Sequence, residues 1–571
     1  MINKKSLKEM FNFTTNKNKT IMISIIIFIQ SLPYLYFYQK ILSLVVDNYM
    51  PNKNLRMVYI LSAILLLIIV ISFVFDYYSE TRRKICCYDN DRQIKNRIFK
   101  VIQYASISDL DKIQTGNLFE LTTNQSFIAS QLFIWNFTGI FSVRLRSILM
   151  VSILMLFINY KIAFIIIGTF ILSYVILLPF YNANMKNYKI VLQSIINLQE
   201  KINEYIESFS TTKTLRLEEI NMNEINLILE ISKNKYLKTN KILALHTTFF
   251  SLMTFFAVIF TLIIGGNEII MGIGVVSTVM LLVDYISDIN DHMQSLLEHA
   301  HGILNKYNAF IQILKICAIA REKDNGIKDI GKIKSIEFKN VKMSYDNENI
   351  ILDGINLKIG KPMTIAIVGK SGCGKTTLVN LIPRFYELLE GKILINDVDY
   401  RNYKLSELRK NISYVFQDPV ILNMSVKDNL IYGVENADFE KVKNICIKLG
   451  IDEKIMSMPN NYNTIINDKT DLLSFGEKQL ISYARAILKN GDIVILDEVT
   501  SNLDLEFEQN IIKANKTLLK NKIAFIIAHR LNTIKDADLI LFIEDKHILE
   551  KGTHEELLKL NGKYAELFLT K

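Results

Sequence analysis

Cysteine is scarce in this chain, and the cysteines that are present form no recognisable pattern. The 571 residues include five of them, Cys86, Cys87, Cys317, Cys373 and Cys446, and no two make a C-x-x-C pair. A disulfide scaffold is therefore excluded, and free thiols in a cytosolic compartment are expected. The histidines outside one motif described below show no metal-ligand spacing, so they predict no metal site.

Extremes of overall composition are also absent. Half of the residues are apolar and 22% are charged, as in an ordinary folded protein, which excludes a disordered chain. The two kinds of residue are segregated, because apolar runs fill roughly the first 290 residues and the remainder has the pattern of a soluble α/β domain. A purely soluble enzyme is therefore excluded. The net charge of +10 does not indicate nucleic acid, because basic loops beside a membrane give the same balance.

Six apolar runs predict membrane-spanning helices, each of which needs about 20 apolar residues. They cover residues 20–46, 57–78, 137–158, 161–182, 246–265 and 269–290. The first run is long and no small-residue cleavage site precedes Asp47, so we do not expect a cleaved signal peptide. Pro33 and Pro179 lie inside spans and predict modest kinks.

Basic residues predict how these spans are oriented. Lysine and arginine are concentrated before the first span and in the connections 82–100 and 186–241, whereas the opposite loops carry chiefly Lys53, Arg56 and Lys161. The positive-inside rule therefore places both termini in the cytoplasm. The two basic connections are too long for simple loops, and we expect helices that project into the cytosol.

Three charged residues lie inside the predicted spans. Counted from Asn159, Arg144 is about 22 Å along the third span with Arg146 beside it, and counted from Glu268, Asp284 is about 24 Å along the sixth. This depth predicts the inner part of the bilayer. Two interpretations remain open: the side chains extend to the inner headgroups, or Asp284 and at most one arginine face a central cavity. A carboxylate in that cavity would favour a cationic substrate.

The second half of the chain contains a phosphate-binding motif. An apolar strand, 363–368, leads into Gly369-Lys370-Ser371-Gly372-Cys373-Gly374-Lys375-Thr376, and a helix that includes Thr377 follows. This is the pattern G-x-x-x-x-G-K-[ST], in which backbone N–H groups surround the phosphates of a nucleotide. The lysine reaches the outer phosphates and the threonine hydroxyl binds Mg²⁺. The motif predicts ATP and Mg²⁺, with no chemistry for Cys373.

A second apolar strand, 493–496, ends in Asp497 and Glu498. In a buried parallel sheet, carboxylates at this position hold Mg²⁺ and polarise the attacking water. Adjacent carboxylates alone are weak evidence, but here they follow a phosphate loop.

These motifs, in this order and spacing, resemble those of an ATP-binding cassette (ABC) exporter half-transporter, and the resemblance covers nearly the whole chain. It implies an α-helical, six-span transmembrane domain of ABC exporter type followed by an α/β P-loop ATPase domain. The implied limits are 1–315 for the transmembrane domain with its cytosolic helical extensions, 316–332 for a linker and 333–571 for the nucleotide-binding domain.

The resemblance also implies roles for individual residues. Tyr345 matches the aromatic residue that stacks on adenine, and Gln417 matches the glutamine that senses the γ-phosphate and Mg²⁺ and contacts the membrane domain. Glu498 matches the catalytic base, Asp504 the D-loop acid and His529 the switch histidine. Taken singly, Tyr345, Gln417 and His529 also fit ordinary structural positions. The implied Mg²⁺ ligands are Thr376, Gln417 and Asp497, and residues 112–123 resemble the segment after the first coupling helix.

The signature that caps ATP on the opposite subunit corresponds to Ser474, Phe475, Gly476 and Glu477. Here Phe475 replaces the usual first glycine, Glu477 replaces glutamine, and the preceding loop 464–470 lacks two glycines typical of the family. Either the position tolerates variation, or one ATP site is weakened in a heterodimer.

The sequence therefore predicts ATP-driven export of a hydrophobic or amphipathic substrate across the cytoplasmic membrane. A small or modified peptide, a drug or a lipid would fit. The expected partners are membrane lipid and a second half-transporter, with a homodimer favoured and a heterodimer open. An ATP-gated channel or regulatory subunit is the alternative, and a soluble cassette ATPase acting on DNA or ribosomes is excluded by the spans.

Overall fold

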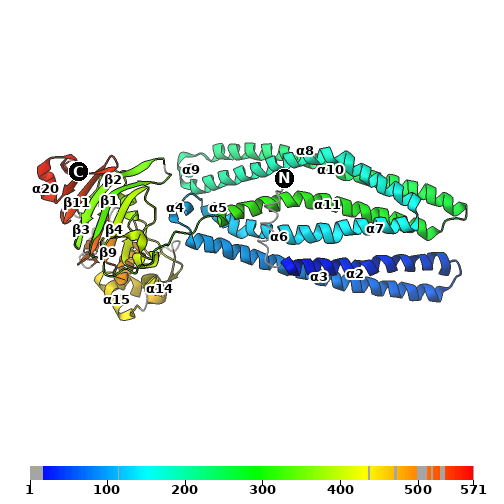
Figure 1. Ribbon diagram of the computed structural model, residues 1–571, viewed down its shortest axis with the longest axis horizontal. Coiled ribbons are helices and arrows are strands. Elements are labelled where there is room, and N and C mark those ends of the chain that lie inside the picture. The colour runs from blue at the N-terminus through cyan, green and yellow to red at the C-terminus, as the bar shows by residue number, and fades with distance from the viewer. Residues whose placement is uncertain are drawn as a thin grey trace. The chain divides into compact units, whose positions relative to one another are not determined.

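The computed structural model describes residues 17–113, 115–346, 348–434, 437–467, 472–497, 511–512, 514–515, 518–527 and 534–569. The chain divides into two compact units (Figure 1). The first unit takes residues 1–103 and 113–319 and is helical, and the second takes residues 104–112 and 320–571 and contains the β-sheets.

Long helices make up the first unit. They are α2 (Lys17–Ser43), η1 (Leu44–Tyr49), α3 (Leu55–Tyr104), α5 (Thr115–Glu120), η2 (Leu121–Gln125), α6 (Ser126–Phe137), η3 (Thr138–Leu145), α7 (Arg146–Ile158), α8 (Tyr160–Glu207), α9 (Phe209–Leu215), α10 (Glu218–Ile270) and α11 (Val276–Cys317). Among the described residues, α3 and α10 are by themselves long and apolar enough to cross a bilayer, and shorter apolar helices run over Arg146–Ile158 and Tyr160–Ile176.

Five of the six predicted spans lie within helical segments, and the sixth is displaced. The prediction 269–290 includes the end of α10 and a turn, because α11 begins only at Val276. Asp284 therefore lies eight residues into α11, which is about 12 Å from its start. The predicted depth of about 24 Å was wrong, because it counted the turn as helix.

The two arginines of the third span have partners inside the protein. The Arg144 Nε donates to the Ser295 hydroxyl on α11 at 2.9 Å, and Arg146 is 7% exposed at the start of α7. The interpretation that both side chains extend to lipid headgroups is therefore wrong for Arg146, which is buried among helices.

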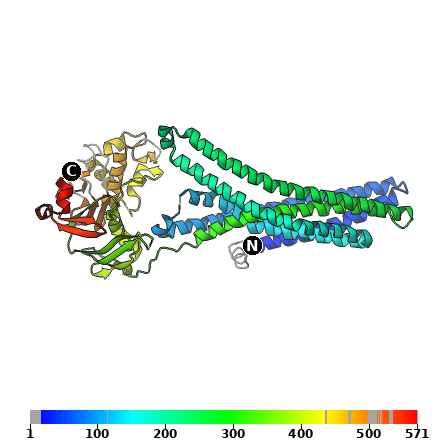
Figure 2. The same ribbon diagram turned by 90° about the horizontal axis from the view of Figure 1, so that it is seen from above.

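The predicted cytosolic extensions are helical. α3 continues to Tyr104, and α8 and α10 form a hairpin that α9 joins at its tip. Both views show this hairpin, and Figure 2 shows α8 and α10 diverging from the other helices toward α9. At the other end of the hairpin, apolar side chains of α7, α8, α10 and α11 pack in one cluster that includes Met155, Ile162, Phe250, Ala257 and Ile286.

Two larger sheets organise the second unit. Within the described residues, one sheet has the strand order β12-β11-β3-β10-β9-β6, and the other, antiparallel sheet has the order β2-β1-β4-β5. β11, β3, β10, β9 and β6 are parallel, and β12 is antiparallel at the edge. The strands are β1 (Ile336–Ser344), β2 (Ile350–Ile359), β3 (Met363–Val368), β4 (Glu390–Ile395), β5 (Val398–Asp399), β6 (Ile412–Val415), β7 (Met424–Ser425), β8 (Ile465–Ile466), β9 (Ile493–Asp497), β10 (Ile523–Ile527), β11 (Leu539–Glu544) and β12 (His547–Gly552).

Short helices surround these sheets. They are α4 (Ile107–Leu110), α12 (Lys375–Asn380), η4 (Tyr400–Asn402), α13 (Leu405–Lys410), α14 (Val426–Ile431), α15 (Phe439–Lys448), α16 (Asp452–Met456), η5 (Asn461–Asn463), α17 (Phe475–Lys489), α20 (His554–Leu560) and α21 (Lys563–Leu569).

The central strands are apolar throughout because both of their faces are covered. Successive residues of β9 alternate between two cores: Val494 and Leu496 belong to one, and Ile493 and Ile495 belong to the other. A strand buried on both faces has no need of polar residues until it ends. The charged residues of the parallel strands, Asp497 on β9 and Glu544 on β11, stand at their carboxyl ends, where the site lies.

Candidate functional site

The carboxyl ends of the parallel strands bring several predicted residues to one edge of the sheet. The phosphate loop follows β3, Asp497 ends β9, and Gln417 comes two residues after β6. β10 lies between β3 and β9 and pairs with both in parallel register. Ligands of open α/β sheets bind outside this edge.

The phosphate loop needs glycine where other backbone or side chains come close. A Cβ at Gly369 would lie 2.3 Å from the Ile543 carbonyl oxygen and 2.7 Å from the Cys373 Sγ. Gly374 has φ +101° and precedes α12, and its Cβ would meet Leu352 at 2.9 Å. A side chain at either position would push the loop outward, so the glycines keep its backbone N–H groups available to a phosphate.

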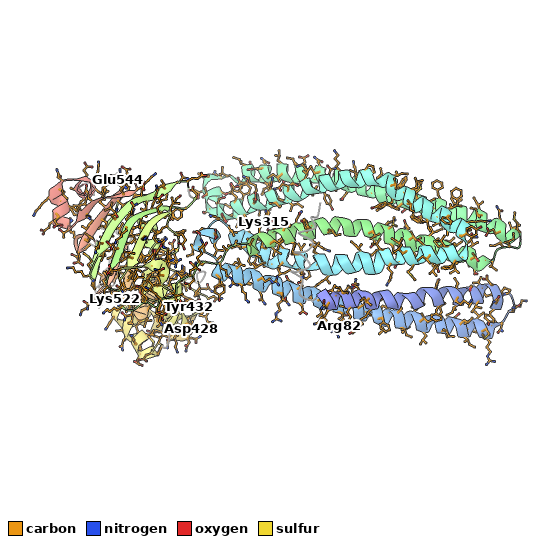
Figure 3. The ribbon with its side chains drawn as sticks, in the orientation of Figure 1. Arg82, Lys315, Asp428, Tyr432, Lys522 and Glu544 are labelled. Carbon is orange, nitrogen blue, oxygen red and sulfur yellow. The ribbon has the colours of Figure 1, made fainter. Side chains whose placement is uncertain are left out.

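Two lysines are fixed around this loop. The Lys375 ammonium is 5% exposed and donates to the carbonyls of Gly369 at 3.1 Å and Lys370 at 2.9 Å. Lys370 pairs with Glu544, labelled in Figure 3, at 2.9 Å. Among the described residues, the buried ammonium thus donates to backbone carbonyls and pairs with no carboxylate, which suits a group that binds an anionic ligand.

The predicted magnesium residues Thr376 and Asp497 lie together. The Thr376 hydroxyl donates to the Asp497 Oδ1 at 3.4 Å, and Asp497 is 5% exposed. A hydroxyl and a buried carboxylate are oxygen donors of the kind Mg²⁺ prefers, so these residues fit that ion. Gln417, the third predicted ligand, is exposed after β6.

A tyrosine that the sequence did not single out completes this group. The Tyr414 hydroxyl donates to the Asn380 Oδ1 at 2.8 Å, and the Asp497 Oδ2 lies 3.5 Å from it. Burial, followed by the charge of Asp497, raises the pKa of Tyr414 well above its usual value. The hydroxyl therefore keeps its proton at neutral pH and acts as a donor at the end of β6.

Tyr345 and Thr377 also meet at this site. Their hydroxyls are 2.9 Å apart, and the Tyr345 ring meets the Tyr386 ring edge-on with a centroid distance of 4.9 Å. The Tyr386 hydroxyl donates to Asp111 at 2.7 Å, just after α4. Tyr345 is 44% exposed, so its ring remains accessible to a flat ligand.

A cavity of about 440 Å³ lies beside Gln417. Phe416 and Asp418, the two neighbours of Gln417 in the chain, line it together with Tyr414 and Arg485. The Tyr414 and Phe416 rings stack at 4.1 Å. Because Phe416 precedes Gln417 and Tyr414 carries the hydroxyl beside Asp497, this stack links the exposed glutamine to the magnesium residues.

The signature residues begin α17. The Ser474 hydroxyl accepts from the Glu477 N–H, and the Glu477 carboxylate accepts from the Ser474 N–H, which together form a capping box. Phe475 is 40% exposed, and Gly476 is buried. Glu477 therefore has a local role in starting the helix, which explains why a carboxylate is accepted in place of an amide.

Three predicted residues lie outside the described part of the chain: Glu498, Asp504 and His529. The strands that precede two of them are described. Glu498 directly follows β9, and His529 comes two residues after β10.

Sequence reasoning missed Tyr414, Asn380, Tyr386 and Asp111. They come from four separate places in the chain and meet only through the fold. The one local signal was the position of Tyr414 on a strand, three residues before Gln417.

Comparison with known proteins decides the family. The family model of the ABC transporter transmembrane region matches residues 21–289, and the family model described as ABC transporter matches residues 352–501. The ATP-dependent lipid A-core flippase of Desulfotalea psychrophila is 30% identical over 84% of both chains. The chain belongs to the ABC transporter family. It combines a membrane domain of exporter type with a nucleotide-binding domain, and it is an ATP-hydrolysing exporter.

Other relatives agree with this assignment. YgaD of Bacillus subtilis, named as a candidate multidrug export ATP-binding/permease protein, is 29% identical over 98% of both chains. The solved structure of a bacterial Atm1-family ABC exporter with ATP bound matches with a TM-score of 0.81 at 20% identity, covering 97% of this chain and 98% of that one. This likeness confirms the predicted fold class.

Proposed function

We propose that this ABC exporter moves a hydrophobic or amphipathic substrate, such as a drug, a lipid or a small peptide, out across the cytoplasmic membrane. The observation that carries the proposal is the combination of a nucleotide site at the sheet edge with apolar helices of bilayer length in one chain. The relatives named for multidrug export and for lipid A-core flipping support this range of substrates. We further propose that both termini lie in the cytoplasm and that the limits 1–315, 316–332 and 333–571 separate the domains.

The chemistry we propose for the site is phosphoryl transfer to water. Lys375 and the loop N–H groups bind the phosphates, Tyr345 stacks on adenine, and Thr376, Asp497 and Gln417 hold Mg²⁺. When bound, the ion neutralises charge on the phosphates. Glu498 orients and deprotonates the attacking water, and His529 contacts the γ-phosphate. Most of the catalytic effect comes from placing these groups, because phosphoryl transfer requires little covalent chemistry from the protein.

We propose that the working form is a dimer. Beyond the bilayer, the α8–α10 hairpin exposes large apolar side chains, among them Ile206, Phe209, Leu215, Ile220 and Leu227, which are 61–66% exposed. Apolar side chains exposed together outside a membrane mark a surface that a partner covers. Ser474–Glu477 would then cap the ATP held by the second subunit. We favour two copies of this chain.

Reconstitution tests the proposal. The purified chain in liposomes is expected to hydrolyse ATP, to accumulate a hydrophobic substrate only when ATP is supplied, and to run at twice 66.0 kDa in light scattering with detergent subtracted. Currents across the bilayer without ATP-driven accumulation would instead indicate a channel. Hydrolysis without substrate stimulation or accumulation would indicate a regulatory subunit.

A further inference from the structure

A row of carboxylates lies on one side of α11. Asp284, Asp288 and Asp291 are all exposed. They are spaced by four and three residues, so at 100° per residue they lie within about 60° of one another around the helix. The opposite side of α11 carries Leu282, Ile286 and Ile289, which are buried in the apolar cluster with α7, α8 and α10. We call the three aspartates the acidic face.

The acidic face lies at the depth of the membrane interior. Counted from Val276, the three aspartates are about 12, 18 and 22 Å along α11. If α11 begins near the outer surface, the midplane of a hydrocarbon core about 30 Å thick falls between Asp284 and Asp288. Exposed carboxylates at this depth are costly in lipid, so the acidic face must meet water, a second subunit or a ligand.

Among the described residues, no lysine or arginine forms an ion pair with the acidic face, although Asp291 acts on the neighbouring His292, which Arg144 and Arg146 also influence. The charged groups that act on Asp288 are the two other aspartates. The Tyr38 hydroxyl on α2 donates a hydrogen bond to the Asp284 Oδ2 at 3.2 Å. The two arginines of the third span have other partners. The Arg144 Nε donates a hydrogen bond to the Ser295 hydroxyl, and the acid whose charge acts on Arg146 is Asp76 on α3. Within the described part of the chain, one of the three carboxylates therefore accepts a side-chain hydrogen bond, and none forms an ion pair.

A second and independent feature borders the acidic face. The Tyr285 side chain is 2% exposed, and its hydroxyl finds no hydrogen-bond partner among the described residues. Tyr285 packs in the apolar cluster, but Asp284 directly precedes it in α11 and Asp288 lies three residues on, and both act on its hydroxyl together with Tyr38. Tyr285 therefore stands at the border between the apolar cluster and the acidic face. A buried hydroxyl without a partner is unfavourable, and a ligand or water that enters the cluster satisfies it.

We propose that Asp284, Asp288 and Asp291, with Tyr38 and Tyr285, form a binding site for a hydrophobic organic cation. This site deepens the proposed export function and rests on it, because it assigns the charge of the substrate. The carboxylates bind the positive charge, and the half-buried Tyr38 ring offers a π-face to it. In a homodimer a second acidic face doubles the negative charge. A lipid or peptide that carries an amine would satisfy the same chemistry, whereas an anion would be repelled.

Two ions of the same shape and opposite charge test the site. Tetraphenylphosphonium and tetraphenylborate are each dialysed against the full chain in detergent without ATP. We expect tetraphenylphosphonium to bind at least tenfold more tightly than tetraphenylborate, and to lose at least tenfold in affinity in the triple variant Asp284→Asn, Asp288→Asn, Asp291→Asn. Fluorescent ATP-analogue binding checks that each variant is folded.

A matched control removes three acids elsewhere. Glu207, Glu219 and Glu230 are exposed on the α8–α10 hairpin, and changing all three to Gln removes the same charge. We expect this control to keep the parent's affinity for tetraphenylphosphonium. Equal binding of the two ions by the parent, or equal loss in the control and the aspartate variant, overturns the site. ATP hydrolysis by the parent is measured separately, so that failure of the proposed export function is distinguished from failure of the cation site.

Discussion

Replacing Tyr414 by Phe tests whether its hydroxyl supports the magnesium residues or only the fold. The change removes a donor that lies 2.8 Å from the Asn380 Oδ1 and 3.5 Å from the Asp497 Oδ2. Loss of the shorter bond is worth about 0.5–1.5 kcal/mol of stability. For a domain of about 150–250 residues, which is near the size of the second unit, each kcal/mol lost lowers Tm by about 2–4 °C. Loss of the longer contact removes a group that orients the Asp497 carboxylate, which the Thr376 hydroxyl still contacts.

The effect on Mg²⁺ follows from the second contact. Removing a group that orients a metal ligand costs about 10- to 100-fold in metal affinity, and the 3.5 Å separation favours the lower end. We therefore expect the Mg²⁺ concentration that gives half-maximal ATP hydrolysis to rise about tenfold in Tyr414→Phe. Binding of ATP in the absence of Mg²⁺ should change little.

Tyr462→Phe is the matched control. The Tyr462 side chain is 5% exposed, and its hydroxyl donates to the Asp452 Oδ1 at 2.6 Å, where α16 begins. Its loss should lower Tm by a similar amount and leave the Mg²⁺ dependence unchanged. If both variants show the same Mg²⁺ midpoint as the parent, Tyr414 has only a structural role and the argument fails.

Three further substitutions address the site. Lys375→Ala removes the buried ammonium that lies over the phosphate loop, so ATP affinity should fall by at least tenfold in equilibrium dialysis, and unaltered affinity would contradict the assignment of the loop. Glu498→Gln should keep ATP binding and lower the hydrolysis rate by about 100-fold or more, and near-normal turnover would show that Glu498 is not the base. Phe475→Gly should raise ATP hydrolysis of the isolated chain severalfold if this phenylalanine weakens a shared site. An ordinary parent rate that the substitution leaves unchanged would remove the heterodimer interpretation.

Local sequence predicted the phosphate loop because the loop is a local structure. Its strand, its glycines and its lysine are consecutive in the chain, and each has a steric or electrostatic reason to be what it is. The same holds for Asp497, where a strand buried on both faces ends in a charge. The fold class followed from these motifs together with the apolar runs, and the comparisons confirmed it.

The tyrosines around the site could not be predicted in this way. Tyr386 meets Tyr345 and Asp111 through segments far apart in the chain, and Tyr414 reaches Asp497 across two neighbouring strands. No spacing rule connects such residues. Tyrosine is also common in ordinary cores, so its identity alone indicates no role.

The position of the acidic face depended on where one helix begins, and the apolar pattern hid that point. Residues 269–276 read IIMGIGVV, so an average of hydrophobicity passes from α10 into α11 without a break. Two features mark the turn. Gly272 has φ +74°, a conformation that favours glycine, and the Asp47 carboxylate accepts the Ser277 N–H at 3.2 Å, which satisfies a free amide at the start of α11. The glycine is visible in the sequence, whereas the capping carboxylate comes from a residue 230 positions earlier. Because α11 starts at Val276, Asp284 lies about 12 Å along this helix. In the topology proposed above, that depth is the outer half of the bilayer, where a carboxylate requires water or a ligand and cannot reach the inner headgroups.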